Sequence, residues 1–406
     1  MKNQIDRRTF IKIAGSSSAA VCLSPRFAFA GMPKSDRKIR VGVVGGRFGL
    51  GFYFNEHPNC TVEAVSDLRE DRRTALMKTY QCKKSYESLE VMLHDPKIEA
   101  IGLFTGAPDH ARQVIMSLNA GKHVLCAVPV ALNLQDCQMV LETVKRTGLT
   151  YMMAETTTYM QSVITAKKFF RQGDFGNVFS SASWYHHPGQ EPLWFDSEMK
   201  PTWRHGLPPM LYPTHVTAHI VAVTGERLIS ASCLGWGDDS PILKGNMYHN
   251  PFWNERAFFK TDKGNSFLGE LFWKGALVAV ERGEWLGDKM SFYTDDHESG
   301  LGDFKVVYDE KQTSTDSAGF IVAKPKIEKY QQEMWWKTDM LPESMRHDSA
   351  HGGSHTFITH EFISSIIENR KPEIDIHESL AYTVPGIIAH DSALKNGELM
   401  NIPTLT

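Results

Sequence analysis

The 406-residue sequence predicts an α/β fold in two parts, an N-terminal doubly wound parallel sheet and a C-terminal α+β domain with a largely antiparallel open sheet. Three observations lead to this prediction. An apolar β-type run ends in a glycine cluster at residues 45–49, strands and helices alternate from there to residue 155, and longer β-type runs without crossover helices follow from about residue 177. Alternation is typical of parallel sheets, whereas successive strands joined by turns indicate antiparallel ones.

The first strand and its glycine loop lie in Lys38-Ile-Arg-Val-Gly-Val-Val-Gly-Gly-Arg-Phe-Gly49. A continuous apolar run is typical of a parallel strand buried on both faces. Glycines after it let the backbone turn tightly against a pyrophosphate, and a helix over residues 51–56 would point its amide dipoles at the phosphates. The loop is one residue shorter than Gly-x-Gly-x-x-Gly, so alone it leaves a plain strand–turn–helix open. The candidate cofactor contacts are Gly45, Gly46, Arg47, Phe48 and Gly49.

Asp67 stands about 20 residues past the glycines, after a second β-type run over residues 61–65. An acid at this place accepts hydrogen bonds from the adenosine ribose and repels a 2′-phosphate, so it favours NAD over NADP. The nearby Arg69, Arg72 and Arg73 would weaken that discrimination. The alternative role of Asp67 is to cap the helix that follows it.

The remaining elements continue these two patterns. In the first part we expect helices over residues 69–80, 86–95, 111–120 and 134–147, and strands over 100–105, 122–127 and 150–154. In the second part we expect strands over 178–185, 228–236, 266–273 and 276–282, a helix from 209 to 223, and closing helices over 356–367 and 378–395. The predicted organisation is a targeting segment (1–30), a nucleotide-binding domain (38–155), a substrate-binding α+β domain (156–345) and C-terminal helices that pack back on the domain junction (346–406).

The first 30 residues have the features of a twin-arginine export signal. Asp6-Arg7-Arg8-Thr9-Phe10-Ile11-Lys12 precedes a modest apolar stretch, and Ala28-Phe29-Ala30 is typical of a cleavage site. We therefore expect a periplasmic protein that is exported after it has folded and collected its cofactor.

Composition excludes several classes of function. The formal net charge is −3, and basic residues are scattered among acids, so no nucleic-acid surface is expected. No apolar run reaches the roughly 18 residues that span a bilayer. Removal of the signal leaves five dispersed cysteines, which argues against a disulfide framework and for small buried side chains.

Three segments resemble the glucose–fructose oxidoreductase/inositol dehydrogenase (Gfo/Idh/MocA) family. They are Ala107-Pro108 with His110, the run Ala120-Gly-Lys-His-Val-Leu-Cys-Ala-Val-Pro-Val-Ala-Leu132, and the closing Pro385-Gly-Ile-Ile-Ala-His-Asp-Ser-Ala-Leu-Lys-Asn-Gly-Glu398. The resemblance covers the chain from Lys38 to its end. It implies a Rossmann domain, a sheet-based C-terminal domain, an NAD(P) cofactor and a sugar or cyclitol substrate. The cofactor contacts that it adds are Pro108, His110, Ala127, Val128 and Pro129.

One position departs from that family. Its dehydrogenases carry Glu-Lys-Pro where this chain has Ala127-Val128-Pro129, and the lysine assists removal of the hydroxyl proton. Valine can neither ionise nor hydrogen bond, while Pro129 keeps the turn that shapes the nicotinamide pocket. Either catalysis has been lost or other residues supply the base.

Tyr212-Pro213-Thr214-His215 offers such residues. It opens a helix, and two side chains three residues apart face the same way. The positive end of the helix dipole favours a neutral imidazole and a more acidic phenol, both useful in proton transfer. A structural role for His215 is the alternative.

Tyr-Pro-Thr-His together with Val-Pro resembles one branch of the family, the NAD-dependent glycosidases typified by α-N-acetylgalactosaminidases. The resemblance implies that bound NAD⁺ oxidises the C3 hydroxyl, a base takes the acidified C2 proton, the C1 substituent leaves, water adds, and the ketone is reduced again. Glu155 and Tyr159 match a Glu and Tyr four apart in the branch, and Tyr185 matches the tyrosine proposed as the C2 base. A helix-start pair is the alternative for Glu155 and Tyr159.

Further candidates would contact the sugar. His351 and His355 lie on a glycine-rich loop and suit sugar hydroxyls, although Ser354 between them is also a possible helix N-cap. The other candidates are His186, Trp203 and Arg204. We expect no metal, since no further ligand cluster is evident.

Together these observations predict a glycosidase that works by transient C3 oxidation with tightly bound, recycled NAD. A net dehydrogenase exported from the cytoplasm would stop after one turnover without a means of reoxidation. The alternatives are a conventional NAD-dependent sugar dehydrogenase with His215 as base, and a non-catalytic carbohydrate-binding protein. The expected partners are a small glycoside and a second copy of the chain.

Overall fold

The structure is a computed structural model that describes residues 35–296, 300–309 and 311–406. The predicted export signal over residues 1–30 lies outside the described residues. No helix in the described part of the chain combines the length and the apolar character that crossing a bilayer requires.

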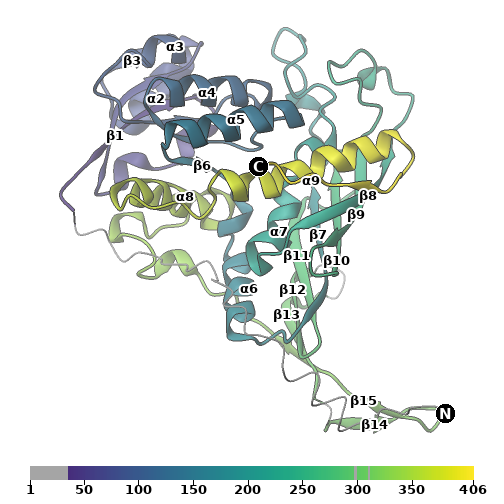
Figure 1. Cartoon of the computed structure of the whole chain (residues 1–406). Helices are drawn as coiled ribbons and strands as arrows, with labels where there is room; N and C mark the ends of the chain where they lie inside the picture. Colours follow the sequence, from purple (N-terminus) through teal and green to yellow (C-terminus); the bar gives the residue numbers. More distant parts are fainter. Residues whose placement is uncertain (1–34, 297–299, 310) are drawn as a thin grey trace, which may run out of the picture. The chain divides into compact units, whose positions relative to one another are not determined.

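Six parallel strands form the N-terminal sheet in the order β3-β2-β1-β4-β5-β6 (Figure 1). Their bounds are Ile39–Val44 (β1), Cys60–Ser66 (β2), Ser85–Tyr86 (β3), Ala100–Leu103 (β4), His123–Cys126 (β5) and Tyr151–Met153 (β6). Strands β4 and β6 are buried along their whole length, as the continuous apolar runs predict. Because the strand order reverses between β1 and β4, the carboxyl ends of the strands open a crevice there. The predicted doubly wound sheet is confirmed.

Helices cover this sheet, and all but one lie close to their predicted positions. They are α2 (Glu70–Tyr80), α3 (Leu89–Met92), α4 (His110–Asn119) and α5 (Leu134–Thr147). The helix expected over residues 86–95 is wrong in its bounds, because Tyr86 belongs to β3 and the Ser88 side chain caps a helix of four residues. Local chemistry sets the ends of α5, because the Asn133 side chain accepts a hydrogen bond from the Asp136 amide at 2.8 Å and Gly148 closes the helix at a φ of 65°.

The helix expected over residues 51–56 is wrong. Two 3-10 turns, η1 (Phe48–Gly51) and η2 (Phe54–Glu56), stand in its place. Two glycines in four residues disfavour an α-helix. The aromatic rings also bury locally, and Phe52 stacks on Phe104 with ring centroids 4.1 Å apart. The glycine loop therefore has no long helix dipole behind it.

The second sheet has nine strands in the order β16-β13-β12-β11-β7-β10-β9-β8-β17. Neighbouring strands are antiparallel except β7 and β10, which run parallel, so the largely antiparallel prediction is confirmed. The strands are β7 (Val178–His186), β8 (Leu228–Trp236), β9 (Asn254–Thr261), β10 (Ser266–Phe272), β11 (Val280–Gly287), β12 (Met290–Asp296), β13 (Gly302–Val307), β16 (Lys326–Lys329) and β17 (Met400–Asn401). A separate hairpin joins β14 (Thr313–Thr315) and β15 (Ile321–Ala323).

Four further helices complete the fold, namely α6 (Gln161–Gln172), α7 (Thr214–Thr224), α8 (Ala350–Ile367) and α9 (Ile376–Leu394). Helices α6, α7 and α9 pack against the second sheet, and α8 packs against the turns around Phe52 of the first domain. Helix α7 lies on β7, β10 and β11, and α9 runs between β8 and α5 (Figure 1). The core under α6 is largely aromatic, with Phe169, Trp285 and Phe292 buried together. Helix α7 also contacts η4 (Thr157–Tyr159), the turn that follows β6.

Two predicted boundaries in this part are wrong. The strand expected over residues 276–282 begins at Val280, because Leu277 and Val278 are exposed and Gly275 turns the chain at a φ of 144°. The helix expected from residue 209 begins at Thr214, after a 3-10 turn over Pro209–Leu211. Tyr212 therefore lies in the bend before α7.

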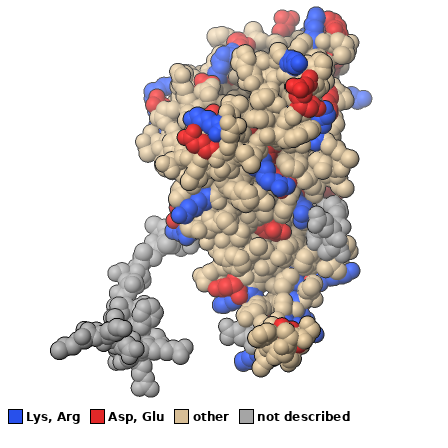
Figure 2. Space-filling view, turned by 90° about the vertical axis from the view of Figure 1, so that its right-hand side faces the viewer, with Lys and Arg blue, Asp and Glu red and all other residues tan. Residues whose placement is uncertain are grey.

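Charges of both signs are interspersed on the face shown in Figure 2. No broad field of one sign is visible on that face.

Candidate functional site

A cleft of about 790 Å³ opens at the carboxyl ends of the parallel strands. The first sheet contributes the loops that follow β1, β2, β4, β5 and β6. The opposite wall contains Tyr185 from β7, Tyr212, His215 from α7, and His351. Its size is in the range of small-molecule and cofactor sites.

The glycine loop has the shape of a phosphate cradle. Gly45 has a φ of 102°, and a Cβ there would stand 2.3 Å from the Phe104 carbonyl oxygen. A Cβ on Gly46 would stand 2.6 Å from the Arg72 Cβ. Only glycine fits both positions. The Gly45 amide donates to the Ser66 carbonyl at 2.9 Å, which holds the loop against the end of β2. The contracted motif is therefore compatible with a bound dinucleotide.

Asp67 lines the cleft at the end of β2, where the adenosine ribose would lie. One carboxylate oxygen accepts from the Gly46 amide at 2.7 Å and the other from the Arg69 amide at 2.9 Å. The Arg69 guanidinium pairs with Asp71, and Arg73 donates to the Asp67 carbonyl. Arg69 and Arg72 line the same part of the cleft, so the acid stands among basic neighbours there.

Replacing Asp67 with alanine should weaken NAD binding about 10- to 100-fold. A hydrogen bond to a charged group contributes about 1.5–3 kcal/mol, and each 1.4 kcal/mol is tenfold in affinity. The affinity for NADP should fall less than the affinity for NAD, because the variant no longer repels the 2′-phosphate of NADP. Titration of cofactor-free protein with both nucleotides measures the two changes. Glu70→Ala, an exposed neighbour outside the cleft, is the control and should bind NAD as the parent does.

The other predicted cofactor contacts divide into two groups. Arg47, Phe48, Ala127 and Val128 line the cleft. Gly49, Pro108, His110 and Pro129 lie behind it as supports: the Gly49 carbonyl accepts from the Tyr80 hydroxyl, and His110 Nδ1 donates to the Pro129 carbonyl at 2.8 Å.

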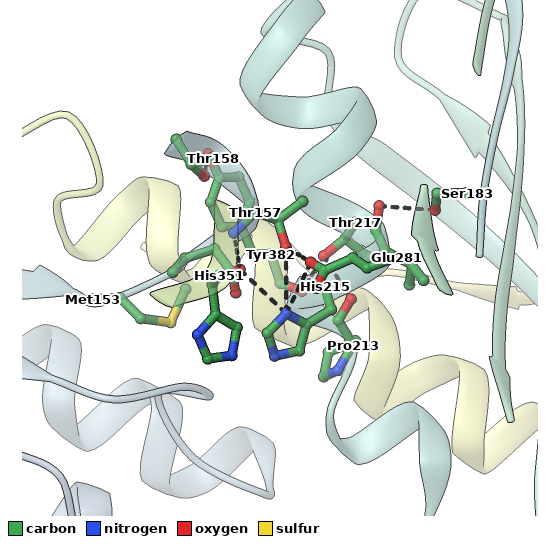
Figure 3. Close-up of polar contacts among 12 residues, drawn as sticks. Met153, Thr157, Thr158, Ser183, Pro213, His215, Thr217, Glu281, His351 and Tyr382 are labelled. Atoms are coloured by element: carbon green, nitrogen blue, oxygen red, sulfur yellow. Dashed lines mark hydrogen bonds and ion pairs between the residues drawn. The ribbon is translucent and has the colours of Figure 1, made fainter. Parts of the chain in front are cut away.

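His215 is the centre of the opposite wall. Its Nδ1 lies 3.2 Å from a Glu281 carboxylate oxygen and 3.6 Å from one of Glu155 (Figure 3). The Thr157 hydroxyl also donates to Glu281, and the Thr157 amide donates to Glu155 at 2.8 Å. Since Nδ1 faces the two carboxylates, Nε2 is the ring nitrogen left for the cleft.

The two carboxylates decide the charge of this histidine. Burial alone would lower the pKa of His215, but Glu155 and Glu281 outweigh it and raise the pKa to about 10. In turn, burial would raise the pKa of Glu281, but His215 and Thr157 hold it at about 2. The neutral imidazole expected from the helix dipole is therefore wrong, because two full charges at hydrogen-bonding distance outweigh a partial one. His215 is an imidazolium at neutral pH.

Two tyrosines flank the imidazolium. Tyr185 stacks on it with ring centroids 4.5 Å apart, and Tyr212 lies 5.1 Å away at a tilt. Tyr185 stands directly opposite Glu281 in the β7–β11 pairing. Burial, with Tyr212 and Glu281 adding to it, raises the pKa of Tyr185 well above its usual value. Its phenol therefore keeps its proton at neutral pH.

Four predicted catalytic or sugar-contacting residues do not line the cleft. Glu155 is fully buried and acts on the site through its contact with His215. Tyr159 is buried against Phe357 with ring centroids 6.0 Å apart. His186 follows Tyr185 on β7 and so points to the other face of the sheet, where it lies 3.2 Å from Glu270. His355 stacks on Phe52 and supports His351 from behind.

Arg204 and Trp203 do line the cleft, as expected for sugar contacts. The guanidinium carbon lies 4.3 Å from the Trp203 ring and 5.6 Å from the Tyr212 ring. Stacking of this kind leaves the edge of the guanidinium free to donate hydrogen bonds to a ligand.

Glu155, His215 and Glu281 together also offer the ligand types of a cation site. One ligand atom from each lies within 4.8 Å of the others. One oxygen of Glu155 is buried and makes no hydrogen bond within the described residues. A metal ion and a proton would compete for His215 Nδ1, because the negative charge of the two carboxylates stabilises either cation there. This cluster could not be predicted from the sequence, because Glu281 stands far from the other two residues along the chain.

Comparison with known proteins identifies the two ends of the chain. Residues 39–155 match the family described as "Oxidoreductase family, NAD-binding Rossmann fold", the Gfo/Idh/MocA oxidoreductases. Residues 301–406 match "Glycosyl hydrolase 109, C-terminal domain". The chain joins a Gfo/Idh/MocA NAD-binding domain to a glycosyl hydrolase 109 C-terminal domain. The expected family resemblance, including its glycosidase branch, is confirmed, and with it an NAD-binding enzyme.

Individual relatives agree with this assignment. A glycosyl hydrolase family 109 protein of Shewanella pealeana is 22% identical, over 99% of this chain and 96% of the relative. The myo-inositol 2-dehydrogenase of Thermotoga maritima is 32% identical over 27% of this chain and 33% of its own length. Among solved structures, a levoglucosan dehydrogenase with NADH and levoglucosan has a TM-score of 0.68 at 16% identity, covering 90% of this chain and all of that one.

Glu281 is the functional residue that sequence reasoning missed. The run around it, Val280-Glu-Arg-Gly-Glu284, has no motif, and only the strand pairing places Glu281 beside Tyr185 and under α7. The signal that could have found it is a charged residue at an inward position of a strand that is otherwise expected to be apolar.

Proposed function

We propose that this enzyme is a glycosidase that cleaves by transient oxidation at C3, elimination across C1–C2, addition of water and reduction at C3. The observation that carries the proposal is His215, which lines the cleft and is held by two carboxylates. Val128 lines the same cleft at the position where dehydrogenases of the family carry a lysine. The glycosyl hydrolase 109 C-terminal domain supports it. So does a relative at 29% identity over 35% of this chain, the 2,7-anhydro-N-acetylneuraminate hydratase of Escherichia coli.

Each cleft residue has a role in this cycle. The chemistry that NAD supplies when bound is acceptance of the C3 hydride and its later return. His215 donates a hydrogen bond from Nε2 to the C3 oxygen, and Tyr212 passes the hydroxyl proton to the water of the cleft. Once C3 is a carbonyl, the imidazolium stabilises the enolate that forms when the C2 proton leaves. Glu155 and Glu281 keep His215 charged and in place.

The cycle returns every hydride to the sugar from which it came. An exported enzyme can then work with one tightly held NAD, which agrees with the export signal that the sequence predicts. We accordingly propose a periplasmic location and a recycled cofactor.

We also propose that the enzyme is a homo-oligomer. Large apolar side chains are exposed on two neighbouring strands of the second sheet, namely Leu234 and Trp236 on β8 and Phe258 on β9, and the β8–β9 pairing puts all three on one face. Contiguous exposed apolar surface of this kind is typical of a protein interface.

The first test is made on protein purified without added nucleotide. We expect that denaturation releases about one NAD per chain and that the native protein, given a panel of aryl α- and β-glycosides in D₂O, frees the aglycone and places deuterium at C2 of the sugar. Nuclear magnetic resonance of the freed sugar reads the label.

Two other outcomes would replace the proposal. A keto sugar without cleavage, with NADH released to solution, would mean a conventional sugar dehydrogenase. Bound NAD with neither cleavage nor exchange on any glycoside would contradict the glycosidase cycle and favour a carbohydrate-binding role.

A further inference from the structure

Two glutamates stand in one row across the second sheet. Glu255 on β9 is paired with Leu271 on β10, and Leu271 is paired in turn with Tyr185 on β7. Tyr185 is paired with Glu281 on β11. Residues that are paired directly on neighbouring strands point to the same face of a sheet. Glu255 and Glu281 therefore both point to the face against which α7 and α9 pack.

The short turn before Tyr212 begins with an amide that the turn itself does not satisfy. The Leu211 amide donates to the Pro208 carbonyl at 3.0 Å. The Tyr212 amide donates to the Pro209 carbonyl at 2.8 Å. Because Pro208 and Pro209 have no N–H, the first amide of the turn is that of Met210. Met210 is buried, so its amide needs an acceptor from outside the turn.

Glu255 supplies that acceptor. Its Oε2 accepts from the Met210 amide at 2.6 Å, and its Oε1 lies 2.7 Å from Nδ1 of His390 on α9. A carboxylate oxygen only accepts, so the His390 nitrogen donates. The Glu255 side chain is fully buried, and a buried carboxylate is tolerated where donors reach its oxygens. The carboxylate thus ties the turn to both β9 and α9.

The closing run over residues 385–398, which carries part of the family resemblance, packs on the same turn. A Cβ on Gly386 would stand 2.2 Å from the Met210 carbonyl oxygen and 2.3 Å from the Pro213 Cβ. Only glycine lets α9 lie this close to the bend. His390 follows one helical turn later and so lies on the same side of α9. The run therefore makes room for the bend with one residue and holds Glu255 with another.

We propose that Glu255 is a positioning residue that sets Tyr212 at the cleft. The inference rests on the proposed function, in which Tyr212 passes on the proton of the C3 hydroxyl. Glu255 holds the turn directly before Tyr212, and Glu281 holds His215 directly after it. The hydrogen-bonded strands between the two glutamates fix their separation. One strand row thus fixes both ends of the segment that carries the tyrosine and the histidine.

Glu255→Met tests the role, because methionine keeps the length of the side chain and removes both acceptor oxygens. We expect reduction of the bound NAD by sugar, followed by stopped-flow absorbance of NADH, to slow roughly 10- to 100-fold, since misplacing a group by about 1 Å costs up to about 10²-fold. The NAD content of the purified protein and the KM for the nitrophenyl glycoside that the parent cleaves fastest should stay within threefold.

Glu255→Gln is the conservative variant. Its carbonyl oxygen still accepts from the Met210 amide, and its amino group can face His390 once that ring takes the tautomer in which Nδ1 accepts. We expect NAD reduction within threefold of the parent. A glutamine variant as slow as Glu255→Met would contradict a role that works through the Met210 amide.

Glu270→Met is the matched control. Glu270 precedes Leu271 on β10 and so points to the opposite face of the sheet. It is also buried, with His186 at 3.2 Å and Arg256 at 2.8 Å. The same substitution therefore removes a buried, paired carboxylate away from the cleft. It should lower the urea midpoint of unfolding and leave NAD reduction within threefold of the parent.

A double-mutant cycle with Tyr212→Phe separates positioning from support of the fold. If Glu255 acts through Tyr212, then Glu255→Met combined with Tyr212→Phe should reduce NAD no more than threefold more slowly than Tyr212→Phe alone. Two independent effects would multiply instead. Gly386→Ala pushes on the same turn from α9 and should show the same dependence on Tyr212. It decides the question if Glu255→Met does not fold.

The outcomes distinguish this inference from the proposed function. If folded Glu255→Met reduces NAD within threefold of the parent, or if its loss multiplies with that of Tyr212→Phe, only the role of Glu255 is overturned. If sugars reduce the NAD of the parent but no glycoside is cleaved, the glycosidase cycle fails, and the double-mutant cycle still decides the role of Glu255. If no sugar reduces the NAD of the parent, the proposed function fails and the role of Glu255 fails with it.

Discussion

Replacing His215 with asparagine is expected to lower kcat/KM for aryl glycosides by roughly 10²- to 10³-fold, the usual scale for loss of one donor to a developing oxyanion. It should also destabilise the fold by about 3 kcal/mol, because Glu155 and Glu281 would face each other in a buried site without their cation. Steady-state kinetics and urea unfolding measure the two effects. Addition of sugar should no longer reduce the bound NAD.

Two further variants separate charge from chemistry. His215→Asn combined with Glu281→Gln should recover most of the lost stability and none of the activity, since the second change removes the repulsion alone. His219→Asn is the matched control: His219 is buried one turn further along α7, does not line the cleft, and is neutral because burial lowers its pKa to about 4. Equal loss of activity in His219→Asn would mean that α7 needs a histidine for packing and would contradict the role of His215.

Lys167→Met is expected to destabilise the protein by about 3–5 kcal/mol, the range for breaking a buried ion pair. In the parent, the Lys167 Nζ lies 2.8 Å from a Glu373 carboxylate oxygen and 2.8 Å from the Thr158 carbonyl oxygen. The side chains of Lys167 and Glu373 are largely buried. Methionine would leave the Glu373 carboxylate without its cation. Because Thr158 follows Thr157, the variant should also loosen the turn that donates to Glu155 and Glu281. Urea unfolding at pH 7 gives the change in free energy.

The next residue in the sequence, Lys168, provides the control. Lys168 pairs with Glu333 at 2.8 Å, but both side chains are more than a third exposed, so Lys168→Met should change stability by less than about 1 kcal/mol. Burial lowers the pKa of Lys167 and raises that of Glu373, so each charge is costly in the folded state. Lys167→Met with Glu373→Leu should therefore be close to the parent in stability. A double variant as unstable as the single one would show that packing, rather than charge, holds this pair.

The sequence was most informative where one local rule acts alone. Periodicity and caps placed α5 and β8 at their observed bounds, and the apolar run before Gly45 placed β1. The same reasoning put Asp67 at the end of β2, where it lines the cleft. In these cases neighbours in the chain determine the outcome.

Prediction failed where distant residues decide. The turns after Gly49 follow from Phe52 packing on Phe104, which is a tertiary contact and overrides a weak helical preference. The charge of His215 depends on Glu281, 66 residues away in sequence. Tyr159 matched a motif, yet its ring packs under α8, because a match in spacing does not say which way a side chain points.

Of the three side chains Glu155, His215 and Glu281, only the imidazolium is positive, so the cluster as a whole has no net positive charge. Because Nδ1 faces the carboxylates, a sugar meets the positive charge only at the Nε2 edge of the ring. The attraction is therefore short in range and directed at one oxygen of the substrate. Evolution of a new sugar preference in this framework is then free to alter the walls of the cleft while leaving this buried cluster unchanged.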